Sequence, residues 1–286
     1  MRRLISPVHP IVREINKAEV EAQKKGFRNH LGASVLGGEC IRELWYHYRW
    51  AHSVEHEAET LRLFQRGHRE EPVLVKGLRA MGAKVAEVDP RTGKQFRITD
   101  HCETIGGSGD GVVALPTELE NELGIKGNGL LEFKTHGDKS FRQFIKFDVR
   151  TAKPVHFVQM QIYMYKMNLK WALYMAINKN TDELYVEIVH AIPLVAQQFL
   201  RRGQEVVNAL EPPRRIREDP SFYKCKFCDY KRICHEGHPP DQNCRTCDNI
   251  ELILDGDSHE WYCHKWGAAP PNKFMEEGCQ DWEPSF

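Results

Sequence analysis

The 286-residue chain has no net formal charge, because 40 lysines and arginines balance 40 aspartates and glutamates. No apolar run approaches the roughly 20 residues that a membrane helix needs. The first residues, MRRLISPVHPIVREIN, also lack the unbroken apolar stretch of a secretory signal peptide. With 41% hydrophobic residues, the composition is ordinary for a folded domain. We therefore expect a cytoplasmic protein without a membrane span.

The balanced total hides an uneven distribution of charge. Residues 241–286 carry three basic and ten acidic side chains, so this end has a charge of −7 and residues 1–240 have +7. A basic body favours a polyanionic partner through neutralisation of phosphates, although a mixed solvated surface gives similar counts in many proteins.

Nine cysteines in a reducing compartment do not indicate a disulfide framework, and they are more typical of metal ligands or buried apolar positions. Two of them, Cys40 and Cys102, stand alone. The other seven crowd into the last quarter of the chain: Cys225, Cys228, Cys234, Cys244, Cys247, Cys263 and Cys279.

Hydrophobic periodicity and turn residues predict helices first, then strands, then further helices. The predicted helices cover 10–25, 34–52, 56–81 (with a kink or break at Pro72), 140–148, 155–168 and 194–210; the predicted strands cover 84–88, 95–99, 111–115, 130–135, 171–177 and 183–190. This order predicts an α/β fold with a central mixed sheet flanked by helices. Pro239-Pro240 separates an expected domain of residues 1–238 from a small acidic tail of residues 239–286.

The most informative segment is Leu130-Leu131-Glu132-Phe133-Lys134-Thr135. Side chains alternate faces along a strand, so Glu132 and Lys134 emerge on one side of it. Upstream, Asp110 lies between glycines at the start of another apolar strand, which leaves room for a ligand. Hydrolysis of a phosphodiester with Mg²⁺ needs hard oxygen ligands and a group that orients water. Asp110 and Glu132 fit the first role and Lys134 the second, although an ExK sequence alone is more often a surface ion pair.

Together these motifs resemble the PD-(D/E)xK nuclease superfamily, because Gly109-Asp110-Gly111 is followed 22 residues later by Glu132-Phe133-Lys134. The resemblance spans roughly residues 28–236. It implies a restriction-endonuclease-like core and a catalytic Mg²⁺ or Mn²⁺ bound by Asp110 and Glu132.

The resemblance also implies an upstream metal ligand on the helix that contains Arg66-Gly67-His68-Arg69-Glu70-Glu71-Pro72. RecB-like and CRISPR-associated members place a histidine there, which corresponds to His68. Lambda-type exonucleases have a Glu-Pro, which corresponds to Glu71-Pro72. The two residues are three apart and share a helix face, so both can point toward the metals, and His68 ranks first.

A second helix carries Gln159 and Tyr163, which resemble the Gln-xxx-Tyr motif that follows ExK in RecB-like nucleases. Their i, i+4 spacing places them on one face, where they can touch the scissile strand or order the lysine. Gln161 and Tyr165 have the same spacing, so the register stays open.

Three cysteines in the pattern C-x2-C-x5-C, Cys225, Cys228 and Cys234, require a fourth ligand from elsewhere. Cys40 lies in a segment that resembles the Ser-Leu-x-Cys-x-Arg-x-x-Trp-Tyr start of iron-sulfur nucleases in the RecB-like and CRISPR-associated branch. The resemblance implies that these four thiolates hold a 4Fe-4S cluster and close the nuclease domain through its C-terminal loop. A structural Zn²⁺ is the alternative, since spacing does not separate the two metals.

The acidic tail contains a second set of four cysteines, Cys244, Cys247, Cys263 and Cys279, which we interpret as a Zn²⁺ site. His259 or His264 can replace one of them. The tail has too few apolar residues for a large core of its own, so a metal would stabilise it. Its negative charge favours a protein partner over DNA phosphates.

Together these features predict a Mg²⁺- or Mn²⁺-dependent DNA exonuclease that acts on ends or single strands in recombination or repair, of host or viral origin. Arg28, Arg42 and Lys153 are the expected DNA contacts; the segment after Arg28 is loosely similar to a lambda-type exonuclease segment whose arginine meets a 5′ phosphate. The alternatives are a structure-selective endonuclease, a CRISPR adaptation nuclease and a non-catalytic DNA-binding subunit. The intact Asp110, Glu132 and Lys134 oppose the last.

Overall fold

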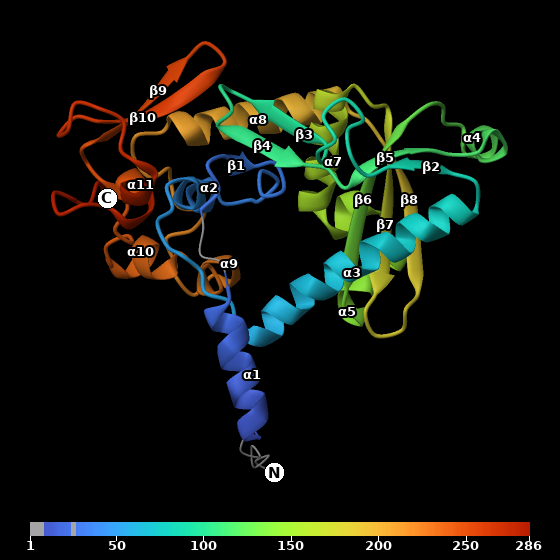
Figure 1. The fold of residues 1–286 in the computed structure, drawn as a ribbon, viewed down its shortest axis with the longest axis horizontal. Coiled ribbons are helices and arrows are strands. Elements are labelled where there is room, and N and C mark those ends of the chain that lie inside the picture. The colour runs from blue at the N-terminus through green and yellow to red at the C-terminus, as the bar shows by residue number, and fades with distance from the viewer. Residues whose placement is uncertain (1–8, 24–26) are drawn as a thin grey trace.

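The computed structural model of the chain describes residues 9–23 and 27–286. Its centre is a mixed sheet with strand order β2-β5-β6-β7-β8 (Figure 1). These strands are Lys84–Ala86, Gly111–Ala114, Gly129–His136, Trp171–Asn178 and Leu184–His190. Only the β6–β7 pair is parallel. A second sheet has the order β1-β4-β3, formed by Leu31–Gly32, Ile105–Ser108 and Arg97–Asp100.

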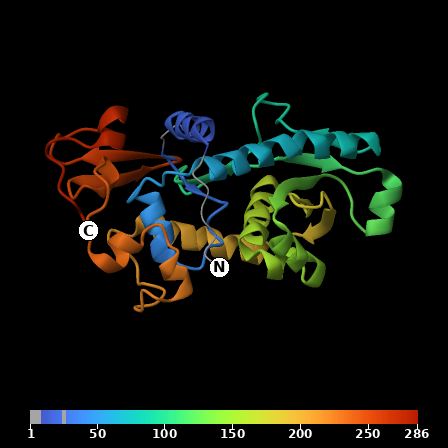
Figure 2. The same ribbon diagram turned by 90° about the horizontal axis from the view of Figure 1, so that it is seen from below.

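Helices cover both faces of the central sheet. The helices before the tail are α1 Pro10–Glu21, α2 Ile41–Tyr48, α3 Ala58–Ala80, α4 Thr117–Leu123, α5 Asp138–Lys146, α6 Val149–Ala152, α7 Pro154–Met167, α8 Pro193–Asn208, α9 Tyr223–Lys226 and α10 Lys231–Glu236. Figure 2 shows α3, in cyan, on one side of the central strands and the olive-green helices α5 to α7 on the other. The predicted class, an α/β fold with a central mixed sheet between helices, is confirmed.

The alternation of side chains along β6 explains the two layers. Leu131 and Phe133 point to the α3 side and join a buried cluster with Leu74 and Leu78. Leu130, on the other face, joins the larger cluster that contains residues of α2, α7 and α8. Glu132 and Lys134 share the face of Leu130, so the strand carries its polar pair toward α7.

Several predicted elements differ from the observed ones. The helix expected over 34–52 is only Ile41–Tyr48, because Gly37 and Gly38 interrupt it and residues 33–37 form turns. A side chain at Gly37 would place its Cβ 2.8 Å from the Cα of Val155, so this turn permits close approach to α7. Pro72 does not break α3, which is one helix.

Other predicted elements also differ from the observed ones. Strand β4 and helix α4 were not predicted, and the strand expected over 95–99 is Arg97–Asp100. The first helix ends at Glu21, and residues 24 and 25 of the expected helix lie outside the described part of the chain. No helix among the described residues is long and apolar enough to cross a membrane.

The tail packs closely against the body. It contains the 3-10 turn η1 Cys244–Thr246, the hairpin β9 Ile250–Asp255 with β10 Ser258–Cys263, and α11 Asn272–Glu277. The guanidinium of Arg245, 1% exposed, donates hydrogen bonds to the carbonyl oxygens of Tyr48 and Asn29, each at 2.9 Å. It also lies 3.8 Å from the ring centre of Trp50. The buried guanidinium of Arg245 therefore joins the tail to the segment that contains Asn29 and to the C-terminal end of α2.

Candidate active site

The site begins where β5 and β6 part. Their antiparallel pairing ends at Gly111 opposite Leu131, while β6 continues to His136 beside β7 alone. Asp110 therefore stands next to Glu132, and its Oδ2 accepts a hydrogen bond of 2.8 Å from the backbone nitrogen of Phe133. At this fork, the point where β5 and β6 separate, the side chain of Asp110 accepts the hydrogen bond that a strand partner would otherwise accept from β6.

Glu132 is fully buried, yet both of its carboxylate oxygens have donors. Lys134 Nζ donates to Oε1 in an ion pair, and Gln159 Nε2 donates to Oε2 at 3.2 Å. The acid thus lies between its own strand and α7. The two donors fix its orientation.

The charges of this group are strongly coupled. Burial raises the pKa of Glu132 to about 7, with Asp110 and Glu71 also raising it and Lys134 opposing them. Burial acts to lower the pKa of Lys134, but the carboxylates of Glu132 and Asp110 outweigh it and raise that pKa. Lys134 therefore stays protonated, and its single positive charge interacts with the carboxylates of Glu132, Asp110 and Glu71.

Helix α3 supplies the third carboxylate. The pKa of Glu71 is raised by burial and then by Asp110, and its Oε1 lies 3.5 Å from His68 Nδ1. Both residues line a cleft of about 480 Å³ with Phe133, Lys134 and Thr135. The side chain of His68 is 79% exposed against 40% for Glu71, so Glu71 is closer to the buried carboxylates and His68 lies at the outer edge.

The structure also distinguishes the two Gln-Tyr registers on α7. Gln159 contacts Glu132, whereas Gln161 donates to the carbonyl of His190 at 2.9 Å and accepts from the nitrogen of Ile192. Tyr163 is buried, and its hydroxyl donates to the carbonyl oxygen of Ser108 at 3.0 Å.

Tyr163 therefore holds the loop that leads to Asp110. Gly107 leaves space for its ring, since a Cβ there would collide with the Tyr163 hydroxyl. Gln159 touches the acid and Tyr163 positions the aspartate loop, from the same face of one helix.

Sequence reasoning missed a polar network beside these residues. The hydroxyl of Tyr174 lies 3.1 Å from His136 Nε2 and 3.0 Å from His156 Nδ1. Burial and then Lys153 lower the pKa of His136 to about 4, and burial and then Lys134 lower that of His156 to about 3. His136 continues the alternation of Glu132 and Lys134, and this pattern was the available signal.

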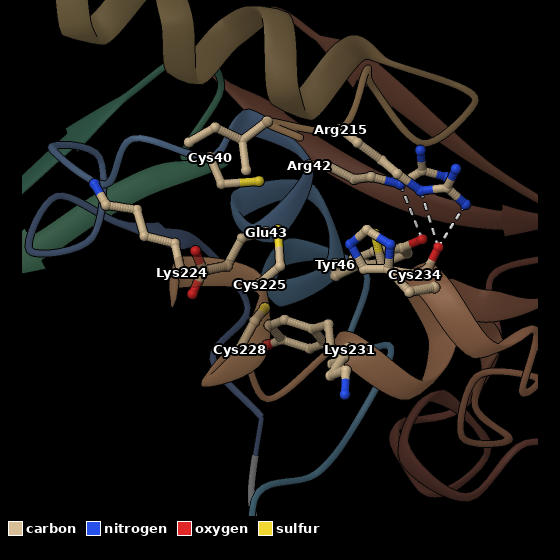
Figure 3. A pocket seen from close by; sticks show the side chains of 13 residues that line it. Cys40, Arg42, Glu43, Tyr46, Arg215, Lys224, Cys225, Cys228, Lys231 and Cys234 are labelled. Carbon is tan, nitrogen blue, oxygen red and sulfur yellow. Dashed lines mark hydrogen bonds between the residues drawn. The ribbon is translucent and has the colours of Figure 1, made fainter. Parts of the chain in front are cut away.

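The first predicted cysteine set lines one small pocket (Figure 3). Cys40 precedes α2, Cys225 lies in α9, Cys228 follows α9, and Cys234 lies in α10. Burial raises the pKa of Cys228 to about 12, with Cys40 among the charges that add to it. Segments nearly two hundred residues apart in sequence thus meet here.

Arg42, which is predicted to contact DNA, lies at this cysteine pocket, where its Nε donates to the Tyr46 hydroxyl at 3.1 Å. Lys153 lies near the Tyr174 network, because its charge lowers the pKa of both His136 and His156. Arg28 is exposed and close enough to Tyr163 for its charge to act on that side chain.

The four tail cysteines line a second small pocket with Asn249 and Trp282. Burial raises the pKa of Cys244 to about 12, and the other three cysteines of this set add to the shift. The candidate replacements lie elsewhere: His264 pairs with Glu251 at 2.9 Å, and His259 Nδ1 lies 2.7 Å from the carbonyl of Cys102. Across residues 9–23 and 27–286, no three His, Cys, Asp or Glu side chains are arranged to hold a metal ion.

No family model and no curated protein matches the chain. Among solved structures, one described as SSO0001 is 16% identical with a TM-score of 0.44, over 78% of this chain and 95% of that one. An alkaline exonuclease (LHK-Exo) from Laribacter hongkongensis is 18% identical with a TM-score of 0.43, over 68% and 90%. The structure of LHK-Exo in complex with dAMP is 17% identical with a TM-score of 0.44, over 68% of this chain and 90% of that one. These likenesses are distant, so the assignment below depends on the site itself.

The neutral histidines predict a loss of stability in acid. Their folded pKa values lie below 6.5, so the unfolded chain binds more protons once the pH falls below that value. Each histidine then removes up to about 1.4 kcal/mol of unfolding free energy per pH unit. Urea unfolding between about pH 7 and 5 should show a shallower slope for His156→Gln than for wild type. The exposed control His238→Gln should keep the wild-type slope, and equal slopes for all three proteins would contradict the assignment.

Proposed function

We propose that the chain is a DNA nuclease dependent on Mg²⁺ or Mn²⁺, and specifically an exonuclease that acts in recombination or repair. The observation that carries this proposal is the meeting of Asp110, Glu132 and Lys134 at the fork between β5 and β6, beside an open cleft. A surface ion pair would not require a fully buried glutamate.

The chemistry of the donor set, rather than the present arrangement of its side chains, supports a divalent cation. Asp110 raises the pKa of both Glu132 and Glu71 in addition to burial, whereas Lys134 lowers both and His68 also lowers that of Glu71. Hard oxygen ligands of this kind suit Mg²⁺ and Mn²⁺. A bound cation would supply Lewis-acid activation of the phosphodiester and of water. His68 would join as a further ligand from the rim of the cleft.

The other residues of the site orient its reactive groups. Lys134 presents its ammonium to the cleft, where it can donate a hydrogen bond to an attacking water or to a phosphate oxygen. Gln159 keeps the Glu132 carboxylate in place, and Tyr163 keeps the Asp110 loop against α7. The substrate backbone would lie in the cleft between α3 and β6, with Lys179, Lys153 and Arg28 as phosphate contacts.

Substitution of Lys134 tests this function. Wild type, Lys134→Ala and the control Lys170→Ala are purified anaerobically and given 5′- and 3′-labelled linear and circular DNA with Mg²⁺ or Mn²⁺. Lys170 is exposed, unlike the partly buried Lys134, and it lies at the opposite end of β7 from the cleft. Cleavage by Lys134→Ala should fall by at least about 100-fold. Lys170→Ala should keep the wild-type rate.

Equal cleavage by wild type and Lys134→Ala, or none by wild type, would overturn the proposal. Cleavage of linear DNA from its ends, with closed circles intact, supports the exonuclease. Cutting of circles instead indicates the endonuclease.

We further propose that Cys40, Cys225, Cys228 and Cys234 hold a 4Fe-4S cluster, and that Cys244, Cys247, Cys263 and Cys279 hold Zn²⁺. The support is that each set of four lines a single pocket, and that neighbouring sulfurs raise the pKa of Cys225 and Cys244 in addition to burial. Each thiol opposes ionisation of its neighbours, and a cation bound by all four would remove this opposition. The cluster would join the entry to α2 with the α9–α10 segment, and the acidic tail outside it remains available for a protein partner.

Serine substitution separates the two metal sites. Anaerobically purified wild type should show an iron-sulfur absorption shoulder near about 400 nm. Cys40→Ser should lose this shoulder and unfold at a lower temperature, because the link between α2 and the C-terminal loop is lost. Cys279→Ser should keep the shoulder and lose zinc. A colourless wild type with zinc at both sites would contradict the cluster.

A further inference from the structure

The segment that follows Phe27 is held rigidly against three parts of the protein. The indole of Trp50 donates to the carbonyl of Arg28 at 2.9 Å, and the tail guanidinium of Arg245 donates to that of Asn29. The nitrogen of Leu31 then donates to the carbonyl of Thr104 at 2.7 Å as β1 joins β4. The side chains of Arg28 and His30 therefore project from a fixed backbone.

The segment after Phe27 and the adjoining strands β3 and β4, here called the platform, carry arginines that form no ion pairs with acidic side chains of the described residues. Arg28 and Arg97 are both exposed, and neither forms an ion pair with another residue in the described portion of the chain. The pKa of His30 is lowered by burial and then by Arg28, Arg97, Arg245 and His259, with no carboxylate opposing them. Unpaired arginines beside a neutral histidine favour an anionic ligand.

Strand β4 connects this platform to the catalytic loop. The ring of His30 lies over Gly106, within 3.3 Å of the position that a Cβ would take there. Arg97 pairs in register with Ser108, two residues before Asp110. From Gly106 to Asp110 the extended chain covers roughly 13 Å. The basic residues thus accompany the strand that leads directly to the carboxylates.

At the other end lies a cavity of about 500 Å³ between the body and the tail. His30 and Arg97 line it from the body, and Phe27 adds an aromatic ring. One face of the Trp50 ring is stacked by Phe27, with centroids 4.6 Å apart, and Arg245 lies 3.8 Å from its centre. Phe27 is partly exposed and lines the cavity, so its ring can offer aromatic surface to a ligand.

We propose that Arg97 and His30, continuing from Arg28, form a track that binds the phosphate backbone of single-stranded DNA between the catalytic cleft and this cavity. This deepens the proposed nuclease function and rests on it. Phosphates would meet the arginines, and a base could stack on Phe27, as in other single-strand binding surfaces.

The cavity favours a single strand over a duplex. Its carboxylates, Glu103, Glu260 and Glu276, belong to the turn before β4 and to the tail, and not to the segments that carry Arg28 and Arg97. One strand can follow the basic residues alone. The second strand of a duplex would bring its phosphates toward these acidic side chains, where like charges repel.

Binding without cleavage tests the track. A fluorescently labelled single-stranded dodecanucleotide and the duplex of the same length are titrated with full-length wild type, Arg97→Gln or Lys126→Gln in EDTA, at several salt concentrations. Lys126→Gln is the matched control, because it removes one exposed positive charge near α4, at the far end of the molecule from the tail (Figure 1). Arg97→Gln should bind the dodecanucleotide roughly fivefold more weakly, with a salt slope lower by about 0.7.

The outcomes separate this proposal from the nuclease itself. Lys126→Gln should match wild type in both affinity and salt slope, and the duplex should bind wild type more weakly than the single strand. Equal affinity and salt slope for wild type and Arg97→Gln would overturn the track, as would a wild type that prefers duplex or binds neither form. The cleavage comparison with Lys134→Ala would be unaffected by such a result.

Discussion

The buried carboxylate of Glu132 is the constraint on which the rest of the site depends. A glutamate without exposure would be costly unless hydrogen-bonded and paired, and here Lys134 and Gln159 supply both. Its nearness to Asp110 and Glu71 then creates more negative charge than one lysine can compensate. The fold therefore stabilises Lys134 as a cation, and the negative charge around it supports the proposal that a divalent cation binds here.

Strand geometry made the centre of this site predictable. Alternation along β6 placed Glu132 and Lys134 on one face, and the glycines around Asp110 indicated a close approach. The finer arrangement was not predictable, because it depends on contacts between distant segments. The choice between Gln159 and Gln161 is decided by packing of α7 against two different strands. Tyr174 gave no sequence signal because it resembles any other core aromatic residue until its two histidine partners are placed.

The same contrast applies to the fold. Long amphipathic helices and the β7–β8 hairpin follow from local periodicity, and they were predicted closely. The two-glycine turn before Cys40 and the short strand β4 depend on tertiary pairing, so local patterns missed them. Pro72 is accommodated inside α3, which continues through it without a break. The tail was predicted as a separate unit of residues 239–286, a prediction that remains untested. Its Arg245 nevertheless binds backbone carbonyls of the body, which places the tail beside the basic track.

The central claim is that Asp110, Glu132 and Glu71 form a site for a divalent cation. Calorimetric titration of Mn²⁺ at about pH 8 tests it directly, since Glu132, with a pKa of about 7, is then ionised. Asp110→Asn keeps the shape of the side chain and its ability to accept a hydrogen bond from Phe133. The account predicts that it binds Mn²⁺ at least about tenfold more weakly than wild type. Equal Mn²⁺ affinity for the two proteins would contradict the account.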